Sequence, residues 1–232
     1  MTKIGFDVIS DLNLTPDESF NWEGKATSLY CIIAGNISND LRTIRQTLLH
    51  LSHFYQGVFY SAGALEYENV PSFATRTIEI AQACGGIRNV ASLHNHVVIV
   101  DGIAIVGSNC WYGNDTPTYD ITFEMEKEGH RHEDLGYLYN TIEKLQLHLD
   151  VKKIIVVTHS VPSLGMFFGE EPETIHGLTP PITSILSDSE HKITHWVYGS
   201  YNKTVDTVID NINYVNNSYY KRKPYWAKRI DV

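Results

Sequence analysis

Residues 4–14 read IGFDVISDLNL, an apolar run that ends in the polar segment Ser10-Asp11-Leu12-Asn13. A nearly continuous apolar run such as residues 4–9 is typical of a strand that is covered on both faces. The same succession of apolar run and polar segment recurs at residues 29–39, 58–66, 153–163 and 193–202. Ligands bind in layered α/β folds where the carboxyl ends of strands converge, so we expect these five polar segments to share one crevice.

Helical patterns lie between the apolar runs. Residues 40–55 and 133–149 each place leucine and isoleucine on one stripe at helical spacing, and residues 72–84 form a third helical pattern. The dipeptide Asp101-Gly102 between two apolar runs is a strong signal for a β-hairpin. The order of these elements predicts an α/β (α+β layered) domain.

The composition predicts one domain that spans residues 1–232, because 43% of the residues are hydrophobic and no low-complexity linker divides them. A net charge of −9 disfavours general nucleic-acid binding. Asp7 occurs too early for a signal peptide, and no apolar run is long enough to span a bilayer. Cys31, Cys84 and Cys110 are widely spaced and are expected to be buried thiols in a reducing compartment, which predicts a cytoplasmic location.

The polar segments resemble, in order and spacing, the motifs of the metallophosphoesterase (calcineurin-like phosphoesterase) superfamily. That family reads SDLH, GD, GNHE, THHAPS and GHTH, where this chain reads SDLN, GN, GALE, THSVPS and GSYN. Residues 106–111 are similar to the family's G-x-x-x-W strand end, and residues 214–219 to its N-P-x-G-Y segment. The resemblance implies a β-sandwich of two mixed sheets flanked by helices.

The family binds two metal ions that hold a phosphate and generate a hydroxide nucleophile. By this resemblance, Asp11 and His159 keep the residue types of two ligand positions. The other ligand positions are replaced by residues that bind metals poorly or not at all: Asn13, Asn36, Ala64, Ser200 and Asn202. An amide nitrogen has no available lone pair, and Asn36 removes the negative charge that bridges the two ions. The resemblance therefore implies a degenerate member with no metal cofactor and no catalytic residue.

Several functions follow from a family member of this kind. The first is an inactive protein that serves as a structural or protein-interaction module. The composition, rich in Asn, Tyr and Ile, resembles that of bacteriophage proteins, so a virion or assembly component is one form of this hypothesis. The second is a weakly active phosphoesterase with a single metal bound by Asp11, His159 and either Glu66 or Asn202. The third is a sensor that binds a nucleotide or a phosphate in the crevice without hydrolysing it. On the first hypothesis, replacing Asp11 or His159 is expected to change stability little, as for exposed polar residues.

Two segments are candidates for contacts with a protein partner or a second copy of the chain. Residues 219–232 form a C-terminal tail whose first eleven residues are basic and aromatic, and its interaction candidates are Tyr219, Tyr220, Lys221, Arg222, Lys223, Tyr225, Trp226 and Arg229. Residues 112–132 are expected to form a long acidic loop. Opposite charges predict a contact between tail and loop, either between subunits or within one chain. A tail packed across its own domain is the alternative.

Overall fold

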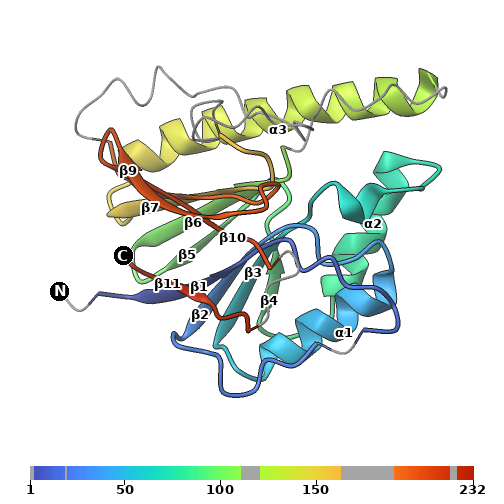
Figure 1. Cartoon of the computed structure of the whole chain (residues 1–232). Coiled ribbons are helices and arrows are strands. Elements are labelled where there is room, and N and C mark those ends of the chain that lie inside the picture. Colours follow the sequence, from blue (N-terminus) through green and yellow to red (C-terminus); the bar gives the residue numbers. More distant parts are fainter. Residues whose placement is uncertain (1–2, 19, 111–120, 163–190, 220–223) are drawn as a thin grey trace.

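The computed structural model describes residues 3–18, 20–110, 121–162, 191–219 and 224–232. Two β-sheets pack face to face, and helices cover their outer faces (Figure 1). The helices are α1 (Leu41–Ser52) and α2 (Phe73–Cys84) on one sheet and α3 (Ile121–Leu147) on the other, and a short 3-10 helix, η1, spans Leu65–Tyr67. The predicted sandwich of two mixed sheets with flanking helices is confirmed.

The first sheet has the strand order β11-β1-β2-β3-β4. Its strands are β1 (Gly5–Ile9), β2 (Tyr30–Ala34), β3 (Gly57–Ser61), β4 (Val90–Ser92) and β11 (Lys228–Asp231). Strands β1 to β4 are parallel and β11 is antiparallel to β1. The parallel strands all end at the same side of the sheet, which places their polar segments together.

The second sheet has the strand order β5-β6-β7-β8-β10-β9. Its strands are β5 (His96–Val100), β6 (Ile103–Ser108), β7 (Lys153–Thr158), β8 (Ile193–Val197), β9 (Thr204–Ile209) and β10 (Ile212–Asn217). The four central strands are parallel, and β5 and β9 join them antiparallel at the two edges. Hairpin turns at Asp101-Gly102 and Asp210-Asn211 make these edges, and all four turn residues have positive φ.

Three apolar layers explain why the strands read as continuous apolar runs. The layer between the sheets contains Phe6, Ile32 and Val157. A second layer joins the first sheet to α1 and α2, and a third joins the other sheet to α3. Successive residues of a central strand therefore enter two different cores. The free thiols of Cys31, Cys84 and Cys110 are buried in these layers, as predicted.

Helix α3 begins at Ile121, so the prediction of a loop over residues 112–132 is wrong from that point onward. Residues 111–120 lie outside the described part of the chain. The first half of α3 lacks an apolar stripe because it contacts α2 through polar groups: the carboxylate of Glu126 accepts a hydrogen bond of 2.8 Å from the Phe73 amide at the start of α2. A carboxylate at a helix N-terminus is a favourable contact, since it satisfies a free amide and the helix dipole.

The described part of the tail packs against its own domain. Strand β11 lies beside β1, and the side chain of Tyr225 is only 4% exposed. The Tyr225 hydroxyl donates to the backbone oxygen of Asn217. Arg229 bonds Asp231 and the backbone oxygen of Thr27. Trp226 differs, because 57% of it is exposed.

Tyr219 is partly buried against the same core, and its ring meets that of Tyr225 edge to face at a centroid distance of 5.0 Å. The remaining interaction candidates, Tyr220, Lys221, Arg222 and Lys223, lie outside the described residues. Of the described candidates, Trp226 therefore offers the largest exposed aromatic surface.

We predict that Tyr225→Ala lowers the free energy of unfolding by about 3 kcal/mol, because it removes a buried ring and its hydrogen bond. The matched control Trp226→Ala should change it by less than about 0.5 kcal/mol, since that ring is exposed. Urea denaturation of the two variants measures both values. Equal effects would show that Tyr225 does not anchor the tail.

Candidate functional site

The five polar segments meet at one end of the sandwich, as hydrogen bonds between them show. The Asp11 amide donates to the Gly35 oxygen at 3.0 Å, and the Gly199 amide donates to the His159 oxygen at 3.1 Å. The third segment joins them through the Leu65 amide, which donates to the side-chain oxygen of Asn36 at 2.9 Å. The Ser200 amide, which follows a strand of the other sheet, donates to the Asp11 carboxylate at 3.1 Å. Strands of both sheets therefore contribute to one polar cluster, which we call the strand-end cluster: Asp11, Asn13, Asn36, Glu66, His159 and Ser200.

Asp11 lies at the centre of the strand-end cluster and is 2% exposed. Its Oδ1 accepts hydrogen bonds from the Asn36 side-chain amide and from the Ser200 backbone amide, both at 3.1 Å. Burial raises the pKa of the Asp11 carboxyl to about 7, an effect that the hydrogen bonds oppose and the nearby Glu66 reinforces. The hydrogen bonds of Asp11 therefore compensate only in part for the loss of hydration of its charged form.

Asn36, which is partly buried, and Asn13, which is exposed, both use their side-chain amides as hydrogen-bond donors within the chain. The Asn36 amide donates to Asp11, and its oxygen accepts from Leu65, so both ends of the side chain are engaged. The Asn13 amide donates to the backbone oxygen of Asp11 at 2.9 Å. The Asn36 amide therefore directs a hydrogen atom, and no lone pair, at the Asp11 carboxylate.

Glu66 is fully buried and holds two polar segments together. Its carboxylate accepts from the backbone amides of Asn36, Ile37 and Gly63 at 2.6–3.1 Å. The Tyr60 hydroxyl donates to it as well, at 2.9 Å. Burial raises the pKa of the Glu66 carboxyl, and these hydrogen bonds oppose the rise. Glu66 thus serves as an internal acceptor for the loops after β2 and β3.

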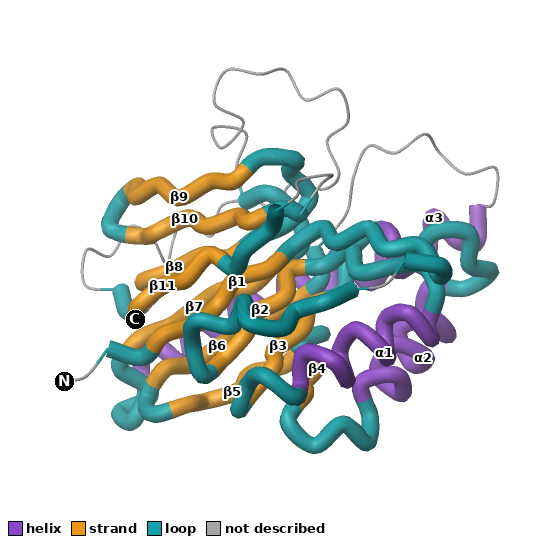
Figure 2. Tube along the Cα trace, turned by 60° about the horizontal axis from the view of Figure 1, so that its bottom comes forward, coloured by secondary structure: helices purple, strands orange, loops and turns teal. Residues whose placement is uncertain are grey.

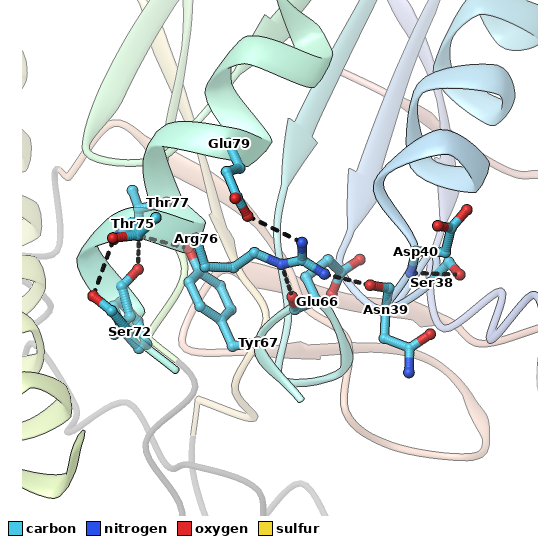
Figure 3. A network of polar contacts seen from close by, with 11 residues as sticks. Ser38, Asn39, Asp40, Glu66, Tyr67, Ser72, Thr75, Arg76, Thr77 and Glu79 are labelled. Carbon is cyan, nitrogen blue, oxygen red and sulfur yellow. Dashed lines mark hydrogen bonds and ion pairs between the residues drawn. The ribbon is translucent and has the colours of Figure 1, made fainter. Parts of the chain in front are cut away.

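Arg76 of α2 fastens the same two loops from the other side (Figure 3). Its guanidinium donates to the backbone oxygen of Glu66 at 2.7 Å and to the backbone oxygen of Asn39. Glu79 on the same helix pairs with it at 3.2 Å. A buried arginine is stable only when its donors are satisfied, and backbone carbonyls fulfil this role here.

His159 is fully buried among three glycines. A Cβ atom added to Gly35, Gly63 or Gly199 would lie 2.3, 2.6 or 2.8 Å from its Nδ1, distances that no real side chain permits. The Nδ1 atom donates a hydrogen bond of 3.1 Å to the backbone oxygen of Ala34, which fixes the proton on that nitrogen. The imidazole therefore links the end of β7 in one sheet to the ends of β2 and β3 in the other.

The backbone of the cluster is unusual at four non-glycine residues. Asp11, Asn13, Asn36 and Ser200 have φ values of 52°, 47°, 56° and 59°, which lie in the left-handed region. Asp and Asn tolerate this region better than most residues, whereas Ser200 adopts it at a cost of about 1 kcal/mol. The tight turns at the strand ends impose these conformations, since the amides of the turns bond neighbouring segments.

The remaining predicted positions contribute little to the cluster. Ala64 is partly buried and has no donor atom, and Asn202 is exposed. The expectation that replacing Asp11 or His159 leaves stability unchanged rested on exposed side chains. Both are buried, so its premise is wrong.

The residues present do not fit the pair of metal ions that the family implies. A cation needs lone pairs of oxygen or imidazole nitrogen directed at it. Here the Asn36 amide presents a donor to the Asp11 carboxylate, and the carboxylate of Glu66 is engaged by backbone amides and Tyr60. Among the residues whose placement is described, no three His, Cys, Asp or Glu side chains form a group that could hold an ion.

Sequence reasoning missed Arg76 and Tyr60, which support the cluster from outside the motifs. Arg76 lies on a helix and reads as a surface residue, and Tyr60 reads as a core residue of a strand. The signal that could have identified Arg76 is its position one turn into a helix that follows the Glu66 segment.

Neither the comparison with known protein families nor that with curated proteins finds a match. Solved structures do match. The phosphopantetheinyl hydrolase of Mycobacterium tuberculosis superposes with a TM-score of 0.68 at 16% identity, over 99% of this chain and 96% of that one. The GAP50 protein of Plasmodium, described as the anchor in the inner membrane complex, gives 0.56 at 10% identity, over 95% and 73%.

A 5′-nucleotidase from Staphylococcus aureus, solved in complex with alpha-ketoglutarate, gives a TM-score of 0.55 at 10% identity. The match covers 93% of this chain and 48% of the nucleotidase. Identities this low establish the fold alone. The chain therefore has a metallophosphoesterase-like fold, the calcineurin-like sandwich of two mixed sheets.

Proposed function

We propose that this protein is a catalytically inactive member of the metallophosphoesterase-like fold that acts as a structural or protein-interaction module. In its most specific form, the proposal is a component of a phage virion or of its assembly, which rests on composition. The observation that carries the loss of catalysis is the hydrogen bonding of Asp11, whose Oδ1 accepts from Asn36 and from Ser200.

The chemistry of this contact supports the proposal. In a two-metal phosphoesterase, carboxylates bind cations and stay ionised, because the ions stabilise their negative charge. Here an amide takes the place of a bridging carboxylate, and burial raises the pKa of Asp11 to about 7. A cation that bound Asp11 would have to displace this proton, since metal and proton compete for the same oxygen.

The structural neighbours are compatible with either kind of role. One is named as a hydrolase and another as an anchor in a membrane complex, so the fold supports both chemistry and attachment. The described residues contain no helix whose length and apolar character would let it cross a membrane.

A weakly active phosphoesterase with one metal is the second candidate. It is favoured by the Oδ2 atom of Asp11, which is buried and has no hydrogen-bond partner within the described residues. His159 and Glu66 would have to complete the site. Glu66 already accepts three backbone amides, and binding a cation would require it to give up some of them.

We expect no turnover of bis-p-nitrophenyl phosphate above background in the presence of manganese, and no stoichiometric Mn, Fe or Zn in the purified protein. Elemental analysis and the hydrolysis assay measure these outcomes. The Asp11→Ala/His159→Ala double variant is the matched control, because any rate that both proteins share comes from contaminants. Multiple turnovers by the natural protein that the double variant loses would establish the single-metal alternative.

We also predict that Asp11→Asn stabilises the protein above pH 7. The folded state keeps the Asp11 proton up to a pH of about 7, whereas the unfolded chain releases it near pH 4. Between these values the folded state binds more protons, so the stability of the natural protein falls as the pH rises. The neutral amide of the variant avoids this loss, which amounts to on the order of 4 kcal/mol above pH 7.

Urea denaturation of both proteins from pH 4 to pH 8 tests this prediction. The difference between them should be smallest near pH 4 and should grow until about pH 7. Titrating groups that do not interact with Asp11 are common to both proteins and cancel in the difference, whereas Glu66 interacts with Asp11 and does not cancel completely. If Asp11→Asn is instead less stable at pH 8, and manganese stabilises only the natural protein, Asp11 is a metal ligand.

A further inference from the structure

The four edge strands of the sandwich differ in how they are protected against pairing with another strand. Native edges are commonly blocked by short length or by charged side chains. Strand β11 carries Lys228, Arg229 and Asp231, β9 carries Asp206, and β4 is only three residues long. Strand β5 reads HVVIV and contains no Asp, Glu, Lys or Arg.

Strand β5 lies at the outer margin of the six-stranded sheet (Figure 2). It pairs with β6 on one side, and the described residues include no strand on its other side. Ile99 is 48% exposed on this strand. An exposed apolar edge without charges is a template for an additional strand.

The hairpin turn determines which backbone groups of β5 point outward. Asp101 and Gly102 have φ values of 48° and 81°, as in a two-residue type I′ turn. The flanking pair Val100 and Ile103 is then hydrogen-bonded, and hydrogen-bonded pairs alternate along the ladder. The N–H and C=O groups of Val97 and Ile99 therefore point away from β6, towards the open edge.

We propose that β5 pairs with β5 of a second copy of this chain, antiparallel and centred on Val98, so that one continuous sheet crosses both copies. In this register Val97 lies opposite Ile99 of the second copy. The outward N–H and C=O groups of Val97 and Ile99 in each strand then all have hydrogen-bond partners in the other strand. Asp101 lies opposite Asn95, so no like charges meet. The sequence of β5 is thus complementary to itself, which is the requirement for a symmetric pairing.

This pairing rests on the proposed interaction role, because it names the partner of that role. The two can fail separately. If the protein is an inactive monomer, the β5 pairing is wrong and the proposal of an inactive site stands. If it is a dimer that hydrolyses phosphodiesters, the pairing stands and the proposal of an inactive site is wrong.

Ile99→Pro tests the pairing directly. Proline removes the outward N–H of Ile99, which β6 does not use, so the monomer should fold while the dimer loses a donor at its centre. Light scattering should give twice the chain mass for the natural protein and the single chain mass for the variant. The matched control is Val208→Pro on β9, whose N–H also points outward next to a two-residue turn; it should remain dimeric.

Cysteine cross-linking then tests the register. Two Val98 residues would face each other as a non-hydrogen-bonded pair with Cα atoms about 4.5 Å apart, within disulfide range. Val98→Cys should form a covalent dimer on mild oxidation, and Val97→Cys should not, because it faces Ile99. The three natural cysteines are buried and should not interfere.

Three outcomes would overturn the proposal: a natural protein of single-chain mass, a dimer that Ile99→Pro leaves intact, or equal cross-linking of the two cysteine variants. Circular dichroism of Ile99→Pro checks that a lost dimer does not reflect a lost fold.

Discussion

The packing of the His159 ring against glycine is the constraint on which the strand-end cluster depends. Three segments approach the imidazole so closely that none of them can carry a side chain at the point of contact. Gly35 and Gly63 come from the first sheet, and His159 and Gly199 come from the second. The ring thereby sets the distance between the two sheets at this end of the sandwich, in a place where the apolar layer between them gives way to polar loops.

Around this contact, two buried carboxyl groups are stabilised by different sets of hydrogen bonds. Asp11 and Glu66 are both carboxyls out of contact with water, and each shift in pKa reflects the loss of hydration. They receive different compensation. Glu66 accepts three backbone amides and a tyrosine hydroxyl, while Asp11 accepts two hydrogen bonds at one oxygen. Asp11 is therefore the less satisfied of the two, and burial raises its pKa to about 7.

The architecture was accessible from the sequence because apolar runs and polar strand ends alternate in a fixed order. The layered α/β class, α2 and the hairpin at Asp101-Gly102 follow from local patterns. The arrangement in two mixed sheets was predicted from the resemblance to the family motifs. The start of α3 was missed because that half of the helix contacts α2 through Glu126 and shows no apolar stripe. The burial of Asp11 and the role of Arg76 depend on contacts between distant segments, which no local pattern contains.

The position of β11 has a consequence for how the molecule reaches this structure. Its residues lie beside β1, with Asp231 opposite Gly5. The outer strand of the first sheet is therefore more than two hundred residues away in the sequence from the strand with which it pairs. Contacts between such distant residues require the closure of a long loop and slow the folding of a chain. During synthesis, β1 emerges from the ribosome before β11, so its outer edge stays unpaired until residues 228–231 have been made. In that interval its open edge is exposed to chaperones and to neighbouring chains.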